Sequence, residues 1–134
     1  MFAALCDDDK YITEEIKKLL LEYAKDNRIT IDIDEFESGE ELLNSEKNYD
    51  IIVLDYQLGS TNGLTVAKEL RKRNVLSSII FLTSYPNFMI DAFEVNTFRF
   101  LLKPIDKSKF FKAIDDYIKI VDANYPITII QNKK

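Results

Sequence analysis

The chain has 134 residues, of which 46% are apolar and 31% are charged, and its formal net charge is −5. These values predict a single acidic domain with one packed core, and they argue against a broad basic surface that binds nucleic acid. The single cysteine, Cys6, excludes an internal disulfide, and the absence of histidine excludes imidazole metal sites and Ser-His or Cys-His nucleophile pairs.

Apolar periodicity and chain breakers predict short strands that alternate with longer helices. In chain order we expect strand 2–6, helix 10–25, strand 29–36, helix 38–43, strand 51–54, helix 64–72, strand 79–82, helix 89–93, strand 98–102 and helix 105–118. The segment 59–63 is expected to be a loop, and Cys6 a small buried hydrophobe. The alternation predicts an α/β fold with a doubly wound, five-stranded parallel sheet.

The pattern changes after Asp122, where residues 123–126 resemble a linker and residues 127–130 a lone strand. One strand cannot form a domain alone. We therefore expect a domain at 1–122, with 123–134 as a linker and the truncated start of a second domain. No run approaches the ~18 apolar residues of a membrane span. The first residues lack a basic leader, so we expect a cytoplasmic protein.

Ligands of an open parallel sheet bind beyond the carboxyl ends of its strands. Polar side chains follow four of the predicted strands: Asp7, Asp8 and Asp9, then Asp55, Thr83 and Lys103. Clustered carboxylates repel one another unless a cation intervenes, and hard oxygen ligands without imidazole or thiolate suit Mg²⁺. Taken alone, the acidic run could instead cap the following helix, which is the main role expected for Asp9. Asp55 alone could be a turn residue.

A carboxylate beside Mg²⁺ can attack a phosphoryl group and form an aspartyl phosphate. Phosphoryl transfer requires mainly positioning and neutralisation of the oxygens. Lys103 would supply a point positive charge and Thr83 a hydroxyl donor. Taken alone, Lys103 is most simply a surface lysine, and Thr83 a β-branched strand residue. Their joint placement at strand ends favours a phosphoryl-transfer site built on Asp55.

These residues stand in segments that resemble the receiver domain of bacterial response regulators. The segments are CDDD at 6–9, IIVLDYQL at 51–58, a loop ending at Gly63, FLTS at 81–84 and FLLKPI at 100–105. The resemblance covers about residues 1–120 in order and spacing. It implies a flavodoxin-like (βα)5 receiver fold with strand order 2-1-3-4-5.

The resemblance also implies a role for each site residue. Asp55 resembles the phosphoacceptor, and Mg²⁺ would be held by Asp7, Asp8, Asp55 and the backbone carbonyl of Gln57. Thr83 resembles the switch hydroxyl, and Lys103 resembles the lysine that pairs with a phosphoryl oxygen. Such proteins catalyse only their own phosphorylation and dephosphorylation, so the chain is not expected to be an enzyme in the usual sense.

Three further positions carry expectations from the same family. Phe100 falls at the switch aromatic and lacks a hydroxyl, so any switching there would come from packing. Gln57 and Tyr85 fall at positions that tune the phosphoryl lifetime. A bulky Tyr85 predicts slow self-dephosphorylation, the alternative being an exposed aromatic without a kinetic role. The bond before Pro104 is commonly cis in the family.

The stretch AFEVNTFRFLLKPI at 92–105 resembles receivers of LytR/AgrA-type regulators, whose output is a β-rich LytTR DNA-binding domain. The tail ITIIQNKK resembles the opening strand of such a domain, although Arg99 departs from the acidic residue typical of the motif. The resemblance implies a sensor histidine kinase as phosphodonor. It also implies a homodimer through the fourth helix, fifth strand and fifth helix, about residues 87–122. DNA would be contacted only through the missing output domain, with no role for a membrane.

Other functions make different demands on the same residues. A degenerate receiver, acting as a phosphorylation-independent interaction module, would lack the metal pair or the lysine. A flavodoxin-like cofactor binder needs a Gly-, Ser- and Thr-rich phosphate loop after the first strand. Here Asp7, Asp8 and Asp9 would repel a phosphate. A haloacid-dehalogenase-like phosphatase needs a second Asp where Gln57 stands.

Overall fold

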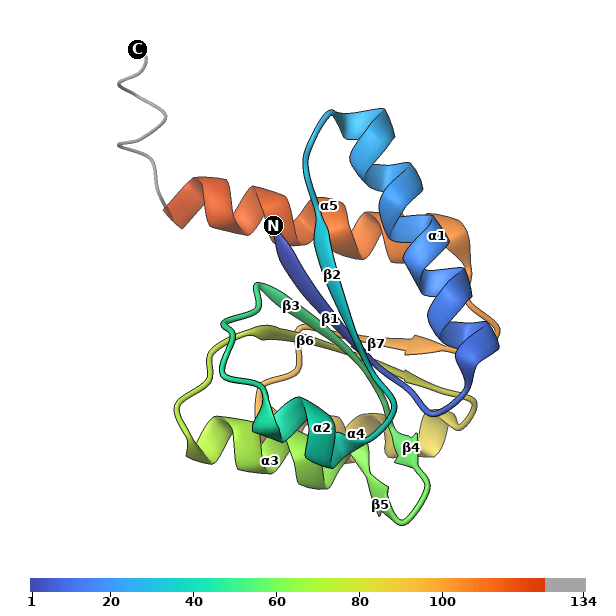
Figure 1. Cartoon of the computed structure of the whole chain (residues 1–134), viewed down its shortest axis with the longest axis vertical. Coiled ribbons are helices and arrows are strands. Elements are labelled where there is room, and N and C mark those ends of the chain that lie inside the picture. Colours follow the sequence, from blue (N-terminus) through green and yellow to red (C-terminus); the bar gives the residue numbers. More distant parts are fainter. Residues whose placement is uncertain (125–134) are drawn as a thin grey trace. The chain divides into compact units, whose positions relative to one another are not determined.

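A computed structural model describes residues 1–124. Five parallel strands form one sheet in the order β2-β1-β3-β6-β7, and a two-stranded hairpin joins β4 and β5 (Figure 1). The elements are β1 (Phe2–Cys6), α1 (Lys10–Asn27), β2 (Asp32–Phe36), α2 (Gly39–Asn44), β3 (Ile51–Asp55), β4 (Gln57–Leu58), β5 (Thr61–Asn62), α3 (Gly63–Lys72), β6 (Ser78–Thr83), α4 (Met89–Ala92), β7 (Arg99–Leu102) and α5 (Lys107–Asn124). Apart from the hairpin, this is the predicted order 2-1-3-4-5, so the predicted fold class is confirmed.

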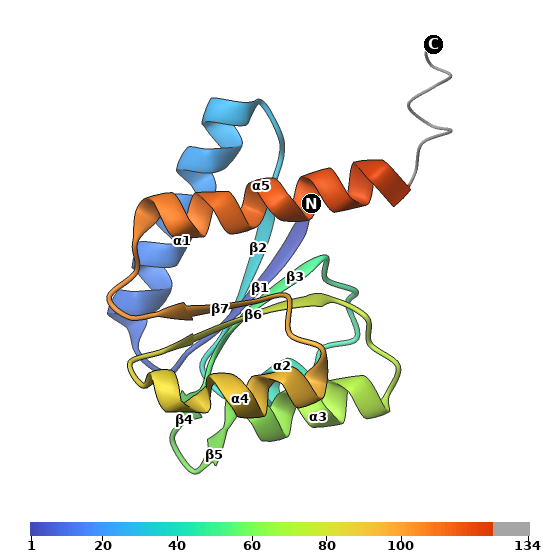
Figure 2. The same cartoon turned by 180° about the vertical axis from the view of Figure 1, so that it is seen from behind.

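Within residues 1–104, helices cover both faces of the sheet. Helix α1 lies on one face, and α2, α3 and α4 lie on the other (Figures 1 and 2). Strand β3 is buried along its whole length, as its continuous apolar run predicts. One buried cluster joins the second face to its helices: Ala4, Cys6, Leu42, Tyr49, Ile52, Leu54, Tyr56, Leu58, Val66, Ala67, Leu70, Ile79, Phe81, Ala92 and Val95.

The chain divides after Pro104 into two compact units, so α5 is described by itself. This helix begins directly after Asp106. The Asp106 carboxylate accepts hydrogen bonds from the Ser108 hydroxyl at 2.7 Å and from the backbone N–H of Lys109 at 3.2 Å. Such bonds satisfy donors that a helix start leaves unpaired.

Several element boundaries differ from the sequence-based expectation; the last helix, expected at 105–118, is Lys107–Asn124 and so includes the first two residues of the expected linker. Strand β2 begins at Asp32 rather than at residue 29, because Arg28 adopts a left-handed conformation (φ 55°) that ends α1. The segment 59–63, expected to be a loop, contains β5 and the first residue of α3. The predicted strand at 127–130 lies outside the described residues. Across residues 1–124, no helix combines the length and apolar character needed to cross a bilayer.

Candidate functional site

Three strand ends bring the three predicted carboxylates and the predicted lysine to one edge of the sheet. Carboxylate oxygens of Asp7, Asp8 and Asp55 lie within 4.8 Å of one another. The ammonium nitrogen of Lys103 lies 3.3 Å from Asp7 Oδ2 and 3.3 Å from Asp55 Oδ1. Asp7 and Asp55 are buried, whereas Asp8 is exposed. The structure therefore assembles, at the carboxyl ends of β1, β3 and β7, four residues that stand up to 96 positions apart in the sequence.

Backbone pairing beyond the strands holds these residues in place. The N–H of Asp7 donates to the carbonyl of Phe36 at 3.1 Å, and the N–H of Lys103 donates to the carbonyl of Thr83 at 2.7 Å. These bonds continue the parallel ladders past the last strand residues. Because the register is shared, side chains at the ends of neighbouring strands meet.

The two turns around the carboxylates depend on local contacts. Asp7 Oδ1 accepts from the N–H of Asp9 at 2.8 Å, and Asp9 Oδ1 accepts from the N–H of Tyr11 at 2.9 Å. Asp9 is thus the N-cap of α1, which confirms its expected capping role. At Gly63, any Cβ would overlap the backbone carbonyl oxygen of Asp55, so only glycine permits α3 to start this close to the site.

Burial and crowding set the ionisation of the site. Burial, with a smaller contribution from Asp7, raises the pKa of Asp55 to about 6. The pKa of Asp7 is also raised by burial, against the opposing effects of the Asp9 N–H and of Lys103. Burial would lower the pKa of Lys103, but the carboxylates of Asp55 and Asp7 outweigh it and raise the pKa overall. Two crowded carboxylates therefore share one ammonium, which leaves negative charge for a further cation.

The donor set fits Mg²⁺. The available ligands are carboxylate oxygens, with no imidazole or thiolate among them, and Mg²⁺ prefers such oxygens. The group of Asp7, Asp8 and Asp55 is the single such cluster found among residues 1–124. The backbone N–H of Gln57 donates to Asp55 Oδ1 at 3.3 Å. The role assigned to the Gln57 carbonyl stays a prediction.

The predicted switch residues Thr83 and Phe100 lie on β6, which pairs with β3, and on β7, which pairs with β6. Thr83 follows Leu82, the register partner of Asp55, and its buried hydroxyl accepts from the N–H of Tyr85 at 3.2 Å. The Tyr85 side chain is 49% exposed. Phe100 is half-buried against the core cluster. The bond between Lys103 and Pro104 is cis.

A group of aromatic residues beside the site was missed by the sequence analysis. The ring of Tyr56 stacks on Phe88 with centroids 4.2 Å apart and planes 8° apart, and it lies 5.7 Å from the ring of Phe81. Tyr85 meets Phe88 edge-on at 6.0 Å. Burial first, and the negative charge of the Asp91 carboxylate second, raise the pKa of Tyr56. The one available signal was the position of Tyr56 directly after Asp55.

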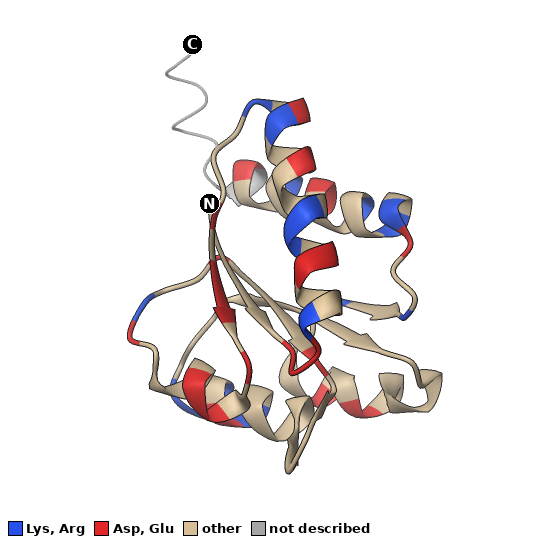
Figure 3. Ribbon diagram, turned by 45° about the vertical axis from the view of Figure 1, so that its right-hand side comes forward, with Lys and Arg blue, Asp and Glu red and all other residues tan. Residues whose placement is uncertain are grey.

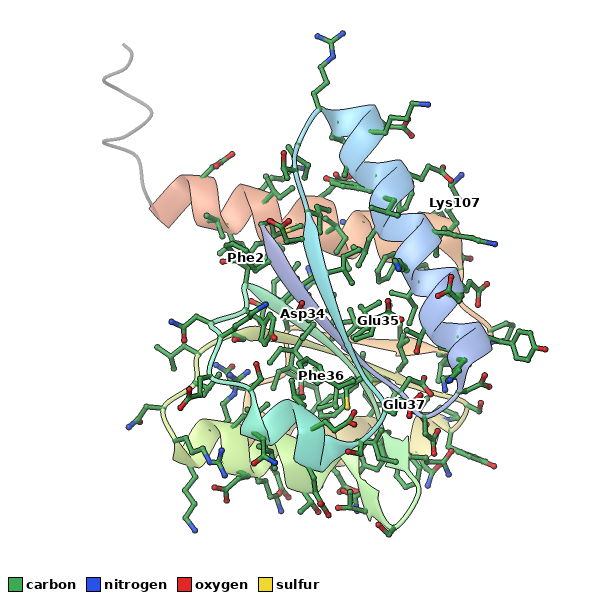
Figure 4. All side chains as sticks on the ribbon, viewed as in Figure 1. Phe2, Asp34, Glu35, Phe36, Glu37 and Lys107 are labelled. Carbon is green, nitrogen blue, oxygen red and sulfur yellow. The ribbon has the colours of Figure 1, made fainter. Side chains whose placement is uncertain are left out.

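A second acidic region, on the edge strand β2, does not belong to the site (Figure 3). Asp34 and Glu35 point to opposite sides of this strand, as strand alternation requires (Figure 4). Lysines neutralise both, since Lys47 lies 3.1 Å from Asp34 and Lys17 lies 3.1 Å from Glu35. Exposed ion pairs of this kind contribute little to stability. Charged side chains on an edge strand do discourage the strand from pairing with another chain.

Comparisons with known proteins agree on one family. The family model of the response regulator receiver domain matches residues 3–115. The sensory transduction protein LytT of Bacillus cereus is 34% identical over 120 residues, covering 89% of this chain and 48% of that protein. The sensory transduction protein LytR of Staphylococcus epidermidis is 32% identical over 117 residues, covering 86% and 45%. The chain thus spans about half the length of the curated relatives it matches.

Solved structures show the same fold. The response regulator TrrA of Thermotoga maritima, solved in complex with Mg(2+)-BeF, superposes with a TM-score of 0.75 at 28% identity, covering 87% of this chain and 97% of that one. The response regulatory domain of mrkE from Klebsiella pneumoniae superposes with a TM-score of 0.79 at 21% identity, covering 90% and 97%. With the family model matching most of the chain, the predicted resemblance is confirmed: this chain belongs to the response regulator receiver domain family.

Proposed function

We propose that this chain accepts a phosphoryl group on Asp55 from the phosphohistidine of a sensor histidine kinase. The observation that carries the proposal is the position of Lys103, 3.3 Å from both buried carboxylates at the edge where Asp8 also stands. A lysine ammonium held between two carboxylates can form a charge-assisted hydrogen bond with an oxygen of a phosphoryl group that binds at Asp55. Membership of the family supports the same assignment.

The proposed transfer is a displacement at phosphorus. A carboxylate oxygen of Asp55 attacks, an O–P bond forms as the P–N bond to the histidine breaks, and the imidazole nitrogen keeps the electron pair. Lys103 neutralises charge on a phosphoryl oxygen, and the Thr83 hydroxyl donates to another. Mg²⁺, held by Asp7, Asp8, Asp55 and the Gln57 carbonyl, would neutralise further oxygen charge when bound.

Reversal requires water to reach the acyl phosphate. Tyr85, at the rim of the site and in contact with Phe88, would hinder that water, and Gln57 would flank it on the other side. We therefore propose a long-lived phosphoryl group. The chain would catalyse only its own phosphorylation and dephosphorylation.

The proposed output is transcriptional and depends on chain that lies beyond the receiver. The relatives LytT and LytR are about twice as long as this chain. We assign residues 1–122 to the receiver and 123–134 to a linker and the start of a LytTR-type domain, which would carry all DNA contacts. The protein would act in the cytoplasm, where the kinase would deliver the phosphoryl group.

Exposed apolar side chains on α4, on the 3₁₀ helix that follows it (Phe93–Val95) and on β7 support homodimerisation on activation. Ile90 is 76% exposed, Phe93 is 74% exposed and Leu102 is 45% exposed. Large exposed apolar side chains are common at protein interfaces. We propose that phosphorylation repacks this surface, with Thr83 and Phe100 as the switch residues, so that two copies pair.

The test uses acetyl phosphate and Mg²⁺ as phosphodonor and cofactor. The wild-type chain should gain the mass of one phosphoryl group, and Asp55→Asn should gain none. Asp50→Asn is the matched control, because Asp50 precedes the same strand that Asp55 ends and accepts a backbone bond from Phe2 at 2.8 Å. Labelling of Asp55→Asn at the wild-type level would overturn the assignment. A wild-type chain that cannot be labelled would instead favour the phosphorylation-independent interaction module.

A further inference from the structure

The hairpin of β4 and β5 connects β3 to helix α3 and borders the carboxylate cluster at two points (Figure 1). At its start, the backbone N–H of Gln57 donates to Asp55 Oδ1 at 3.3 Å. At its tip, Gly59 has a φ of 61°, a left-handed conformation that favours glycine, and a Cβ there would lie 3.7 Å from Asp8 Oδ2. Two of the three clustered carboxylates therefore lie beside this hairpin.

The two strands of the hairpin are held by different kinds of contact. In the first strand, Leu58 is 5% exposed and belongs to the buried core cluster. In the second strand, Thr61 is half-buried and Asn62 is exposed. The residue that follows, Gly63, donates its N–H to the carbonyl of Tyr56 at 2.6 Å. The second strand therefore buries little side-chain surface of its own, and polar bonds at its end matter more for its position.

Asn62 ties this second strand to the first turn of α3. Its Oδ1 accepts from the backbone N–H of Thr65 at 2.9 Å and from the Thr65 hydroxyl at 3.1 Å, so Asn62 is the N-cap of the helix. Across the hairpin, Asn62 pairs in antiparallel register with Gln57. The N–H of Gln57 in turn reaches the carboxylate of Asp55. A continuous set of bonds therefore joins the cap of α3 to the carboxylate cluster.

Building on the metal site of the proposed function, we propose that Asn62 is a positioning residue for Mg²⁺: by capping α3 it holds the second strand of the hairpin and so keeps the Gln57 carbonyl in place as a metal ligand. A backbone carbonyl has no rotamers, so only its own chain segment can position it. Without the cap, the hairpin and the first turn of α3 would open locally in the metal-free chain, and metal binding would have to close them again. Because coupling between sites is reciprocal, Mg²⁺ would also protect the bond between Asn62 and Thr65.

The test compares three single substitutions by calorimetric titration of the whole chain with Mg²⁺. Asn62→Ala removes the cap, whereas Asn62→Ser keeps a side chain that caps helices well. Ser38→Ala is the matched control, because Ser38 is the N-cap of α2 and its hydroxyl accepts from the N–H of Glu41 at 3.1 Å. Helix α2 carries none of the predicted metal ligands, so this control loses the same kind of bond at a different helix.

Asn62→Ala should bind Mg²⁺ several-fold more weakly than wild type, up to the roughly fivefold that one fully transmitted N-cap bond is worth. Asn62→Ser and Ser38→Ala should bind it as the wild type does. Urea unfolding without metal should show similar losses of stability in Asn62→Ala and Ser38→Ala, so that a weaker affinity in the first alone reports positioning and not general destabilisation.

Amide hydrogen exchange of the wild-type chain, followed residue by residue by NMR, tests the same link without a substitution. Saturating Mg²⁺ should slow exchange of the Thr65 N–H, which Asn62 caps, by a larger factor than exchange of the Glu41 N–H, which Ser38 caps. This measurement decides the matter if Asn62→Ala does not fold.

Equal Mg²⁺ affinities in wild type and Asn62→Ala, or an equal loss of affinity in Ser38→Ala, would overturn the inference alone. Equal protection of the Thr65 and Glu41 amides by Mg²⁺ would do the same. A wild-type chain that binds no Mg²⁺ would overturn the proposed metal site and the inference together.

Discussion

The ammonium nitrogen of Lys103 lies 3.3 Å from a carboxylate oxygen of Asp55, in a site where both side chains are largely shielded from water. The same nitrogen lies 3.3 Å from Asp7, so Lys103 partly neutralises two of the three carboxylates that would hold a metal. This arrangement makes Lys103 an electrostatic competitor of a bound dication as well as a partner for a phosphoryl oxygen.

Replacing Lys103 by methionine should therefore strengthen Mg²⁺ binding and slow phosphorylation. Even at the dielectric of bulk water, Coulomb's law gives about 1 kcal/mol for two unit charges 4 Å apart, so loss of the Lys103 charge should strengthen dication binding by at least roughly fivefold. Titration calorimetry measures the affinity, and the rate of labelling by acetyl phosphate measures the second effect. Lys72→Met, at an exposed position near the end of α3, controls for net charge. Unchanged or weaker Mg²⁺ binding in Lys103→Met would contradict this account.

The raised pKa of Asp55 predicts how stability depends on pH without metal. Asp55 has a folded pKa of about 6 against 3.8 in the unfolded chain, so the folded state binds its proton more tightly between these values. Its favourable contribution is complete below about pH 4 and is lost as the pH rises through 6. In urea unfolding with EDTA, the stability advantage of Asp55→Asn over wild type should grow by on the order of 1–3 kcal/mol between pH 4 and pH 7. A pH-independent difference would show that Asp55 is not held in a crowded, desolvated site.

Tyr85→Ala should shorten the life of the phosphoryl group. The half-exposed ring stands two residues past Thr83 and rests on Phe88, where it would limit the approach of water. After removal of the phosphodonor, intact mass measured over time should show decay several-fold faster than in wild type, a change of about 1 kcal/mol in the barrier. Tyr11→Ala, at a position 89% exposed on α1, is the control. Equal decay rates would leave Tyr85 as an exposed aromatic without a kinetic role.

Arg71 should be important for stability although it lies away from the site. Its guanidinium donates to four backbone carbonyls, those of Val75, Ser77, Val95 and Asn96, at 2.7 to 3.1 Å. Arg71→Met should cost about 2–4 kcal/mol in urea unfolding, since several half-buried carbonyls lose a charged donor. Arg73→Met should cost less than about 1 kcal/mol, because Arg73 makes its exposed bonds with Glu69 and Leu43. Similar losses in both variants would contradict the special role of Arg71.

Most of the sheet could be predicted because its central strands leave a strong local signal. The apolar run ending at Asp55 predicts a strand buried on both faces, and the structure has it. The hairpin of β4 and β5 could not be predicted, because two-residue strands are too short to show a period. Arg71 and Tyr56 were missed for a different reason. Their partners stand 24 to 32 residues away in the sequence, at Val95 and Phe88, and only the fold brings them together.

The site residues form an intermediate case. Strand ends predicted that Asp7, Asp8, Asp55 and Lys103 would share one edge of the sheet, and the distances between them agree. Their roles in metal binding and phosphoryl transfer stay predictions, because chemistry depends on ligands as well as on placement.

The central claim is that Asp55 is the phosphoacceptor, and chemical trapping tests it most directly. Borohydride reduces an acyl phosphate to an alcohol, so treatment after labelling with acetyl phosphate and Mg²⁺ converts a phosphorylated aspartate to homoserine. Peptide mapping of the wild-type chain should find homoserine at position 55 and at no other aspartate. Homoserine elsewhere, or labelled protein with Asp55 unchanged, would contradict the account.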